Sequence, residues 1–377
     1  MPGPILGSRP RDASAPVILR AVSRPEKSLF GADRLSLEGR SHNPSDSYSS
    51  QPVARGSCVC FHGRVIGASQ ARFPFLLFIA SFIASPALAG NITLSPDAAR
   101  ALDQTYSGDP DAAIATARAI ERSQPDSPVG YLLEGEAQWW KMYCAACAMQ
   151  WGMLDAWKRP KASEDDAYLA VSHHAIDLAH AQIAKSETAE MHLYAGLGYA
   201  LDARLRGLRD EHRATARAGV AARAEFLRAL ELDPDIADAT AGLGLYNYYI
   251  DSLSGIVKML RFFMGIPGGN KEEGIRQMHV GIDHGVFLAV DSRFYLAKNL
   301  RTYDQRYADA IDIAEPLATR YPRNPVFVLL LANLNQQLGR NAKAAEYFHA
   351  ALLLSPPHAA CAARVHDLAT SSLASLH

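Results

Sequence analysis

The sequence predicts an all-α fold, an irregular solenoid of about six helix pairs in which some helices are extended. Ala-rich segments from Ser95 onward place apolar residues at i, i+3, i+4 and i+7, which is the period of amphipathic helices. Short breaks marked by Pro or Gly separate these segments, and the alternating pattern of strands is almost absent. Three of the segments share one register of about 34 residues, which indicates a repeated helix pair.

The N-terminal part is expected to lie outside this array. Residues 1–71 are rich in Ser, Pro and Arg and have no lasting period, so we expect a disordered leader or a segment upstream of the true translation start. Residues 72–89 begin with Arg72, continue as an apolar run and end, after Pro86, on Ala-Leu-Ala at Ala89. This order is typical of a secretory signal peptide, which predicts an exported protein, periplasmic or envelope-associated, cleaved near Ala89. An uncleaved membrane anchor is the alternative.

The remainder, residues 90–377, is predicted to be one helical-repeat domain. Residues 129–158 and 164–185 show the period of two long helices. Helices of more than standard length are also expected around 198–222, where the chain between two repeat positions is about twice as long as usual. A terminal helix near 358–373 closes the array.

The clearest repeat unit is residues 325–356. Ala332 falls in its first helix, Gly339 marks the turn, and Phe348 falls in its second helix. Residues 307–322 repeat the same spacing one unit earlier. These spacings resemble the tetratricopeptide pattern, in which small residues lie where paired helices cross closely. The resemblance implies antiparallel helix pairs stacked side by side.

A second resemblance covers residues 242–275. Its matching residues are Gly242, Gly244, Tyr246, Asn247, Ser252, Leu253, Lys258, Leu260, Gly265 and Gly274. Their pattern resembles a tetratricopeptide-like family that includes mitochondrial inclusion-body clearance proteins, and exported bacterial proteins of unknown role. The resemblance implies a non-enzymatic helical-repeat protein. Within it, the apolar stripe of 253–264 is expected to be an inserted helix that caps the array or, alternatively, contacts a partner or a membrane surface.

Polar side chains on the first helix of each unit are the candidate binding residues. Aligning the units on Gly242, Lys298 and Ala332 places these side chains on a concave surface. The predicted peptide-binding residues are Tyr246, Asn247, Asn299, Thr302, Asn333 and Gln336. Amides and hydroxyls can pair with an extended peptide backbone, although the same pattern also fits an ordinary polar surface. Val326 and Leu330 replace the cations of the carboxylate-binding repeat class, which argues against capture of a free chain terminus.

Cys144 and Cys147 form the redox-like motif of the chain. Their spacing inside a predicted helix puts both sulfurs on the face that carries Trp140 and Trp151. Three interpretations remain open: buried packing thiols, a structural disulfide between Cys144 and Cys147, and a redox or metal site. The lack of a second such motif argues against structural zinc.

Other chemistry is not indicated. Lys and Arg number 38 and Asp and Glu 39, so no basic excess points to nucleic acid. Residues 265–271 resemble a phosphate loop only in their glycines, because Asn270 and Glu272 stand where the loop needs Gly and Ser or Thr. We expect no cofactor and no metal.

These observations predict a non-catalytic scaffold that mediates protein–protein interaction in the cell envelope through a protein or peptide partner. One alternative is a periplasmic small-ligand binding protein of a transport system. The candidate pocket residues for that alternative are Trp139, Trp140, Tyr246 and Tyr248. A thiol redox protein that uses Cys144 and Cys147 is the third interpretation.

Overall fold

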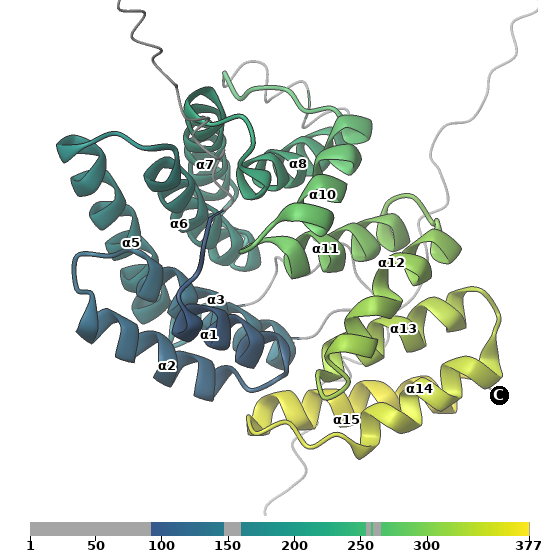
Figure 1. The fold of residues 1–377 in the computed structure, drawn as a ribbon. Coiled ribbons are helices and arrows are strands. Elements are labelled where there is room, and N and C mark those ends of the chain that lie inside the picture. Colours follow the sequence, from purple (N-terminus) through teal and green to yellow (C-terminus); the bar gives the residue numbers. More distant parts are fainter. Residues whose placement is uncertain (1–91, 147–159, 254–257, 259–264, 377) are drawn as a thin grey trace, which may run out of the picture. The chain divides into compact units, whose positions relative to one another are not determined.

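The computed structural model describes residues 92–146, 160–253, 258 and 265–376, and these form thirteen α-helices and no strand (Figure 1). The all-α prediction is confirmed. The leader, the predicted signal peptide, Cys147 and nearly all of the apolar stripe lie outside the described residues. The helices are α1 Pro96–Tyr106, α2 Pro110–Ser123, α3 Val129–Ala146, α5 Asp165–Lys185, α6 Ala189–Leu208, α7 His212–Leu232, α8 Ala237–Ser252, α10 Lys271–His284, α11 Ala289–Thr302, α12 Tyr307–Arg320, α13 Pro325–Gln337, α14 Asn341–Leu353 and α15 Ala359–Ala374.

Local sequence signals begin and end these helices where the pattern predicts. The hydroxyl of Ser95 accepts a hydrogen bond from a backbone N–H in the first turn of α1, and the side chains of Thr188 and Asn270 do the same for α6 and α10. Gly108 and Gly339 have φ of 85° and 69° in the turns that follow α1 and α13. Only glycine adopts this left-handed conformation at little cost, so the predicted turn at Gly339 is confirmed.

The helices of the described residues pack as six consecutive pairs, which are α1 with α2, α3 with α5, α6 with α7, α8 with α10, α11 with α12, and α13 with α14, followed by α15. The long helices predicted at 164–185 and around 198–222 are confirmed, because α5, α6 and α7 have 21, 20 and 21 residues whereas α13 and α14 have 13 each. Of the helix predicted over 129–158, the described residues contain α3 up to Ala146. Among the described helices, none is long and apolar enough to cross a bilayer.

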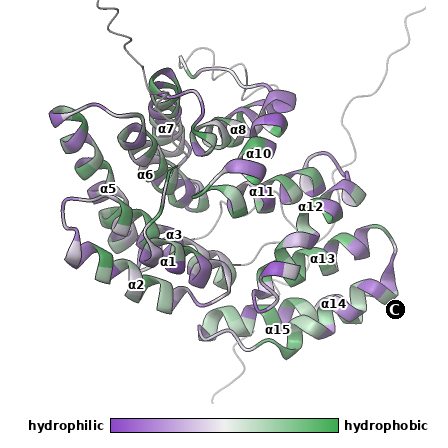
Figure 2. Ribbon diagram, viewed as in Figure 1, coloured by the Kyte–Doolittle hydropathy of each residue, from purple (hydrophilic) through white to green (hydrophobic). Residues whose placement is uncertain are grey.

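The first and second helices of the pairs differ in burial. In α13 every residue from 325 to 335 is buried, whereas its partner α14 buries a single stripe formed by Ala344, Phe348 and Ala351. Figure 2 shows hydrophilic and hydrophobic residues alternating around second helices such as α2 and α7. The first helices therefore form the interior of the array, and the second helices separate them from solvent.

Glycines allow neighbouring pairs to approach closely. The ring of Phe226 on α7 lies against Gly196 of α6 and Gly242 of α8. A Cβ added to Gly196 would lie 2.5 Å from that ring, and one added to Gly242 would lie 2.4 Å from it. These distances explain physically why small residues are needed at the crossings.

The end of the array contacts its beginning. Helix α15 packs against α3, and Asn324, just before α13, donates a hydrogen bond of 2.9 Å from Nδ2 to the carbonyl oxygen of Tyr106 at the end of α1. The faces of the first helices are therefore turned toward one another across a filled interior. The described first helices therefore do not form the open groove that the scaffold interpretation required.

Candidate functional site

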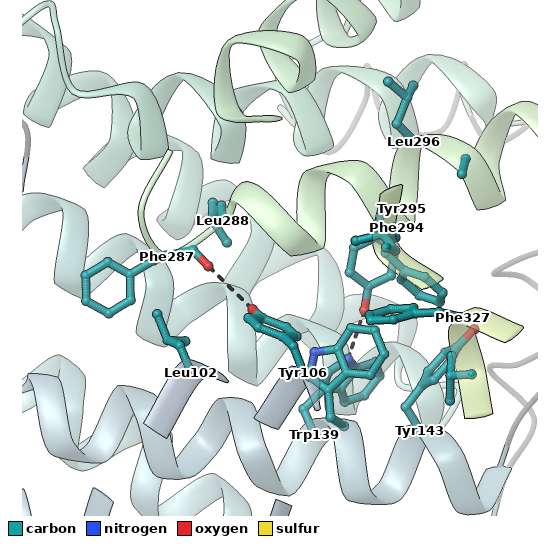
Figure 3. Packing of buried hydrophobic residues seen from close by; sticks show 14 of the residues in the cluster. Leu102, Tyr106, Trp139, Tyr143, Phe287, Leu288, Phe294, Tyr295, Leu296 and Phe327 are labelled. Atoms are coloured by element: carbon teal, nitrogen blue, oxygen red, sulfur yellow. Dashed lines mark hydrogen bonds between the residues drawn. The ribbon is translucent and has the colours of Figure 1, made fainter. Parts of the chain in front are cut away.

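Aromatic side chains from three parts of the chain meet in this interior. The indole of Trp140 on α3 lies 5.7 Å from the ring of Tyr106, 5.0 Å from Phe294 and 5.4 Å from Phe327, measured between ring centroids. Figure 3 shows Tyr106, Phe294 and Phe327 gathered on the same side of α3 as Tyr143. Because edge-to-face and tilted contacts of this kind hold rings in fixed positions, the interior is a specific structure and not a loose apolar core.

An ion cluster lies inside this aromatic interior, formed by Glu136 of α3, Arg204 of α6 and Asp291 of α11. Arg204 donates from Nη1 to Glu136 Oε2 over 2.7 Å and from Nη2 to Asp291. The indole N–H of Trp140 donates to Glu136 Oε1 at 2.7 Å and to Asp291 Oδ1 at 3.3 Å. Asp291 is fully buried, and the side chain of Glu136 is only 12% exposed. One guanidinium thus forms ion pairs with two carboxylates in a largely buried site.

This imbalance of charge changes the acidity of Glu136. Burial raises the pKa of Glu136 to about 7, Arg204 acts in the opposite direction, and Asp291 adds to the rise. A carboxyl group with this pKa exchanges its proton near neutral pH. The ion cluster can therefore hold or release one proton while Asp291 and Arg204 stay paired.

Two small cavities border this region. One is lined by leucines of α1, α3 and α6 together with Glu136, Arg204 and Phe287, and the other by Trp140, Asn324, His358 and the disulfide described below. Each has a volume of about 20 Å³, enough for about one water molecule. An organic ligand would need the surrounding side chains to move apart.

A disulfide joins Cys144 of α3 to Cys361 of α15, which are 217 residues apart in the sequence. The interpretation that paired Cys144 with Cys147 is therefore wrong, and so are the two interpretations in which Cys144 is a free packing thiol or a redox thiol. The physical reason is the packing of α15 on α3, which brings the two Cα atoms to 5.0 Å. Helix spacing along the sequence could not reveal it, because the contact is purely tertiary.

Four cationic and polar side chains lie in the last turn of α11, and they point to different sides of the helix. They are Lys298, Asn299, Arg301 and Thr302. Arg301 donates from Nε to Asn333 Oδ1, and burial lowers its pKa. Asn299 Nδ2 and Thr302 Oγ1 are buried and make no hydrogen bond of ordinary geometry within the described structure.

These side chains include two of the predicted peptide-binding residues and contact a third. Asn299 and Asn333 are only 2% and 5% exposed. The expectation that they lie on an open surface is wrong, because the array folds back and encloses this face. Thr302 is half-buried beside them.

The other predicted binding residues lie elsewhere. Tyr246 is half-buried and donates from its hydroxyl to the carbonyl oxygen of Pro267, and Asn247 donates to Gln277 on α10. Gln336 donates to the hydroxyl of Ser375 after α15. Their side chains are engaged with different neighbours, so the structure does not bring the six predicted residues together on one surface. Peptide binding by them stays a prediction.

The residues predicted to line a ligand pocket likewise lie in different parts of the structure. Trp139 and Trp140 both belong to the interior, where the indole N–H of Trp139 donates to the hydroxyl of Tyr295 at 2.8 Å (Figure 3). Tyr248 is buried on α8 and donates to Asp304. The residues that sequence reasoning missed are Glu136, Arg204, Asp291 and Arg301. The sequence feature that could have identified them is a charged residue on a helix without a polar face, because such a charge is expected to be buried.

No protein-family model matches the chain, and no curated protein is significantly similar to it. Among the described residues, no three His, Cys, Asp or Glu side chains are arranged to hold a metal ion.

Proposed function

We propose that this protein is an exported, non-catalytic binding protein of tetratricopeptide-like type, which holds a small ligand among its first helices. The observation that carries the proposal is the enclosed interior. The faces with which an open array would take up a peptide are turned toward one another, and they carry aromatic rings and an ion cluster. Pockets for small ligands commonly combine such apolar walls with a few polar groups.

Export is supported by two independent features. The segment ending at Ala89 has the order of a signal peptide, and the disulfide between Cys144 and Cys361 is a bond that persists in oxidising compartments. The tetratricopeptide-like assignment is supported by the repeat spacing and by the packing of Phe226 against Gly196 and Gly242.

The test starts from the full chain expressed with its own leader in an export-competent bacterial host. The protein purified from the periplasmic fraction is expected to begin at Gly90 and to release a small molecule on denaturation, in near-equal molar amount, detected by mass spectrometry. Another exported protein prepared in parallel provides the background. Recovery only from the cytosol would contradict export, and an extract identical to the background would contradict the ligand-binding role.

The interaction scaffold is the second candidate, and an exposed apolar side chain favours it. Leu353 at the end of α14 is 84% exposed, so its side chain is available for a contact with another protein. The same preparation distinguishes the candidates. A protein that co-purifies with wild type and is lost from Leu353→Ser, with no small molecule released, would favour the scaffold.

A further inference from the structure

The last helix is attached to both ends of the array. At its C-terminal end α15 stays with the preceding pair, because Gln336 of α13 donates a hydrogen bond of 3.0 Å to the hydroxyl of Ser375. At its N-terminal end it is joined to α3 by the disulfide between Cys361 and Cys144. The disulfide therefore ties the end of the array covalently to its beginning.

A cavity lies along this junction. Its volume is about 20 Å³, which holds about one water molecule. One wall is formed by Pro356, His358 and Cys361, which belong to residues 354–361, the segment that we call the clasp. The opposite wall includes Trp140 of the aromatic interior. The cavity thus marks the contact between the clasp and the interior.

Non-covalent packing at the clasp is weaker than in the rest of the interior. The Nδ1 atom of His358 is buried and makes no hydrogen bond within the described structure, which costs free energy. Side chains that border the cavity also lose contacts there. Helix α15 buries a single stripe, whereas α13 buries every residue from 325 to 335. The buried residues of α15 are Cys361, Val365, Leu368, Ala369 and Ser372.

Two further contacts join the end of the array to its beginning close to the clasp. Asn324 donates a hydrogen bond of 2.9 Å to the carbonyl oxygen of Tyr106, and the rings of Trp140 and Phe327 lie 5.4 Å apart between centroids. Both contacts are non-covalent, so they can break and form again without a chemical step. The disulfide is therefore the bond that keeps this junction permanently closed.

We propose that the disulfide between Cys144 and Cys361 is redox-operated, and that its reduction releases the clasp and opens an entrance to the interior beside Trp140. The proposal rests on the ligand-binding function above and states how a ligand would reach an enclosed interior. In an oxidising compartment the bond is formed and the interior stays closed. A dithiol reductant breaks the bond.

The reduction is a thiol–disulfide exchange. One thiolate of the dithiol attacks Cys144 Sγ, the bond between the two cysteine sulfurs breaks, and Cys361 leaves as a thiolate. The first turn of α15 favours this direction, because a helix N-terminus stabilises an anionic sulfur. The second thiolate of the dithiol then attacks the mixed disulfide, closes a cyclic disulfide and releases Cys144. The dithiol thus gives up two electrons, and its two protons pass to the cysteines. Both cysteines are buried, so the attack follows a transient lifting of the clasp.

Hydrogen exchange of the full chain, followed by mass spectrometry, tests this proposal. The oxidised protein is compared with protein reduced by dithiothreitol under native conditions. Exchange in residues 354–361 and in the last turns of α3 is expected to rise by about tenfold or more, whereas α6 and α7 should not change. Fluorescence of anilinonaphthalene sulfonate should rise several-fold, because aromatic surface becomes accessible. The helical signal in circular dichroism should fall by no more than one helix contributes.

Cys361→Ser is the matched variant. It should show the raised exchange without reductant, and dithiothreitol should have no further effect on it. An equal response of this variant and wild type to dithiothreitol would show that the effect does not pass through this bond. If the variant does not fold, re-oxidation of the reduced wild type with oxidised glutathione takes its place, and exchange is expected to return to the oxidised level. Exchange that stays high would overturn the proposal.

The other outcomes are equally decisive. A disulfide that dithiothreitol does not reduce in the folded protein, or a reduced protein with unchanged exchange at the clasp, would overturn the proposal. Faster exchange in every helix would also overturn it, because the bond would then stabilise the fold as a whole. A clasp that opens in a protein from which no ligand is extracted would contradict the ligand-binding function alone. An extracted ligand with a clasp that does not open would contradict this inference alone.

Discussion

Replacing Glu136 with Gln is expected to remove part of the pH dependence of stability. Burial raises the pKa of Glu136 from 4.5 to about 7 in the folded protein. The native state then binds this proton more tightly than the unfolded state does, so the free energy of unfolding falls as pH rises from about 4.5 to about 7. The difference between the two pKa values corresponds to about 3 kcal/mol. Because the side chain of Glu136 is only 12% exposed, solvent screening reduces this free energy little.

Glutamine mimics the protonated carboxyl group. It keeps an acceptor for the indole N–H of Trp140, and Arg204 keeps Asp291, which leaves one guanidinium for one carboxylate. The variant and wild type should therefore be similarly stable near pH 5. At pH 8 the variant should be more stable, by at most about 3 kcal/mol.

Urea unfolding followed by circular dichroism at pH 5, 6, 7 and 8 measures this difference. Glu121, whose pKa burial also raises to about 7, titrates in both proteins, so its effect cancels. Glu315→Gln, at an exposed position on α12, is the matched control and should follow wild type at every pH. Equal pH slopes for wild type and Glu136→Gln, or a less stable variant at pH 8, would refute the reasoning.

Two further perturbations test the packing. Cys361→Ser removes the disulfide that closes a loop of 217 residues. The added entropy of the unfolded chain is expected to lower the free energy of unfolding, measured in urea, by about 5 kcal/mol. Cys147→Ser is the control and should leave the urea midpoint unchanged. Peptide mapping without reductant would disprove the assigned pairing if it found a free Cys144 thiol in that variant. Gly242→Ala should lower the unfolding free energy by about 1–3 kcal/mol, because its Cβ would lie 2.4 Å from the Phe226 ring. Gly219→Ala on α7, with no atom within 4 Å of the added Cβ, should instead raise it by up to about 1 kcal/mol, and equal effects in thermal unfolding would contradict this account.

The elements of this protein were largely predictable because their signals are local. The range predicted as 164–185 is α5, Asp165–Lys185, and the terminal helix predicted near 358–373 is α15, Ala359–Ala374. Apolar periodicity determines which residues can share a helix face, and Gly339 at a positive φ ends α13 where the pattern breaks.

The candidate site was predictable only in part. Register along the repeats placed Asn299 and Asn333 on the inner face of the first helices, but it could not show that this face is enclosed. Small rotations between successive helix pairs add up over the whole array, and their sum decides whether the face is open or closed. No short stretch of sequence determines this total rotation.

By itself, the sequence determined the all-α class, the pairing of neighbouring helices and the small residues at their crossings, because each depends on residues within about one repeat. The tertiary structure alone decided which distant side chains meet. Glu136, Arg204 and Asp291 come from three helix pairs, and Cys144 meets Cys361 across most of the array. Such contacts depend on how the pairs curve back on one another, so the interior, where Arg301 donates to Asn333, is a consequence of the closed fold.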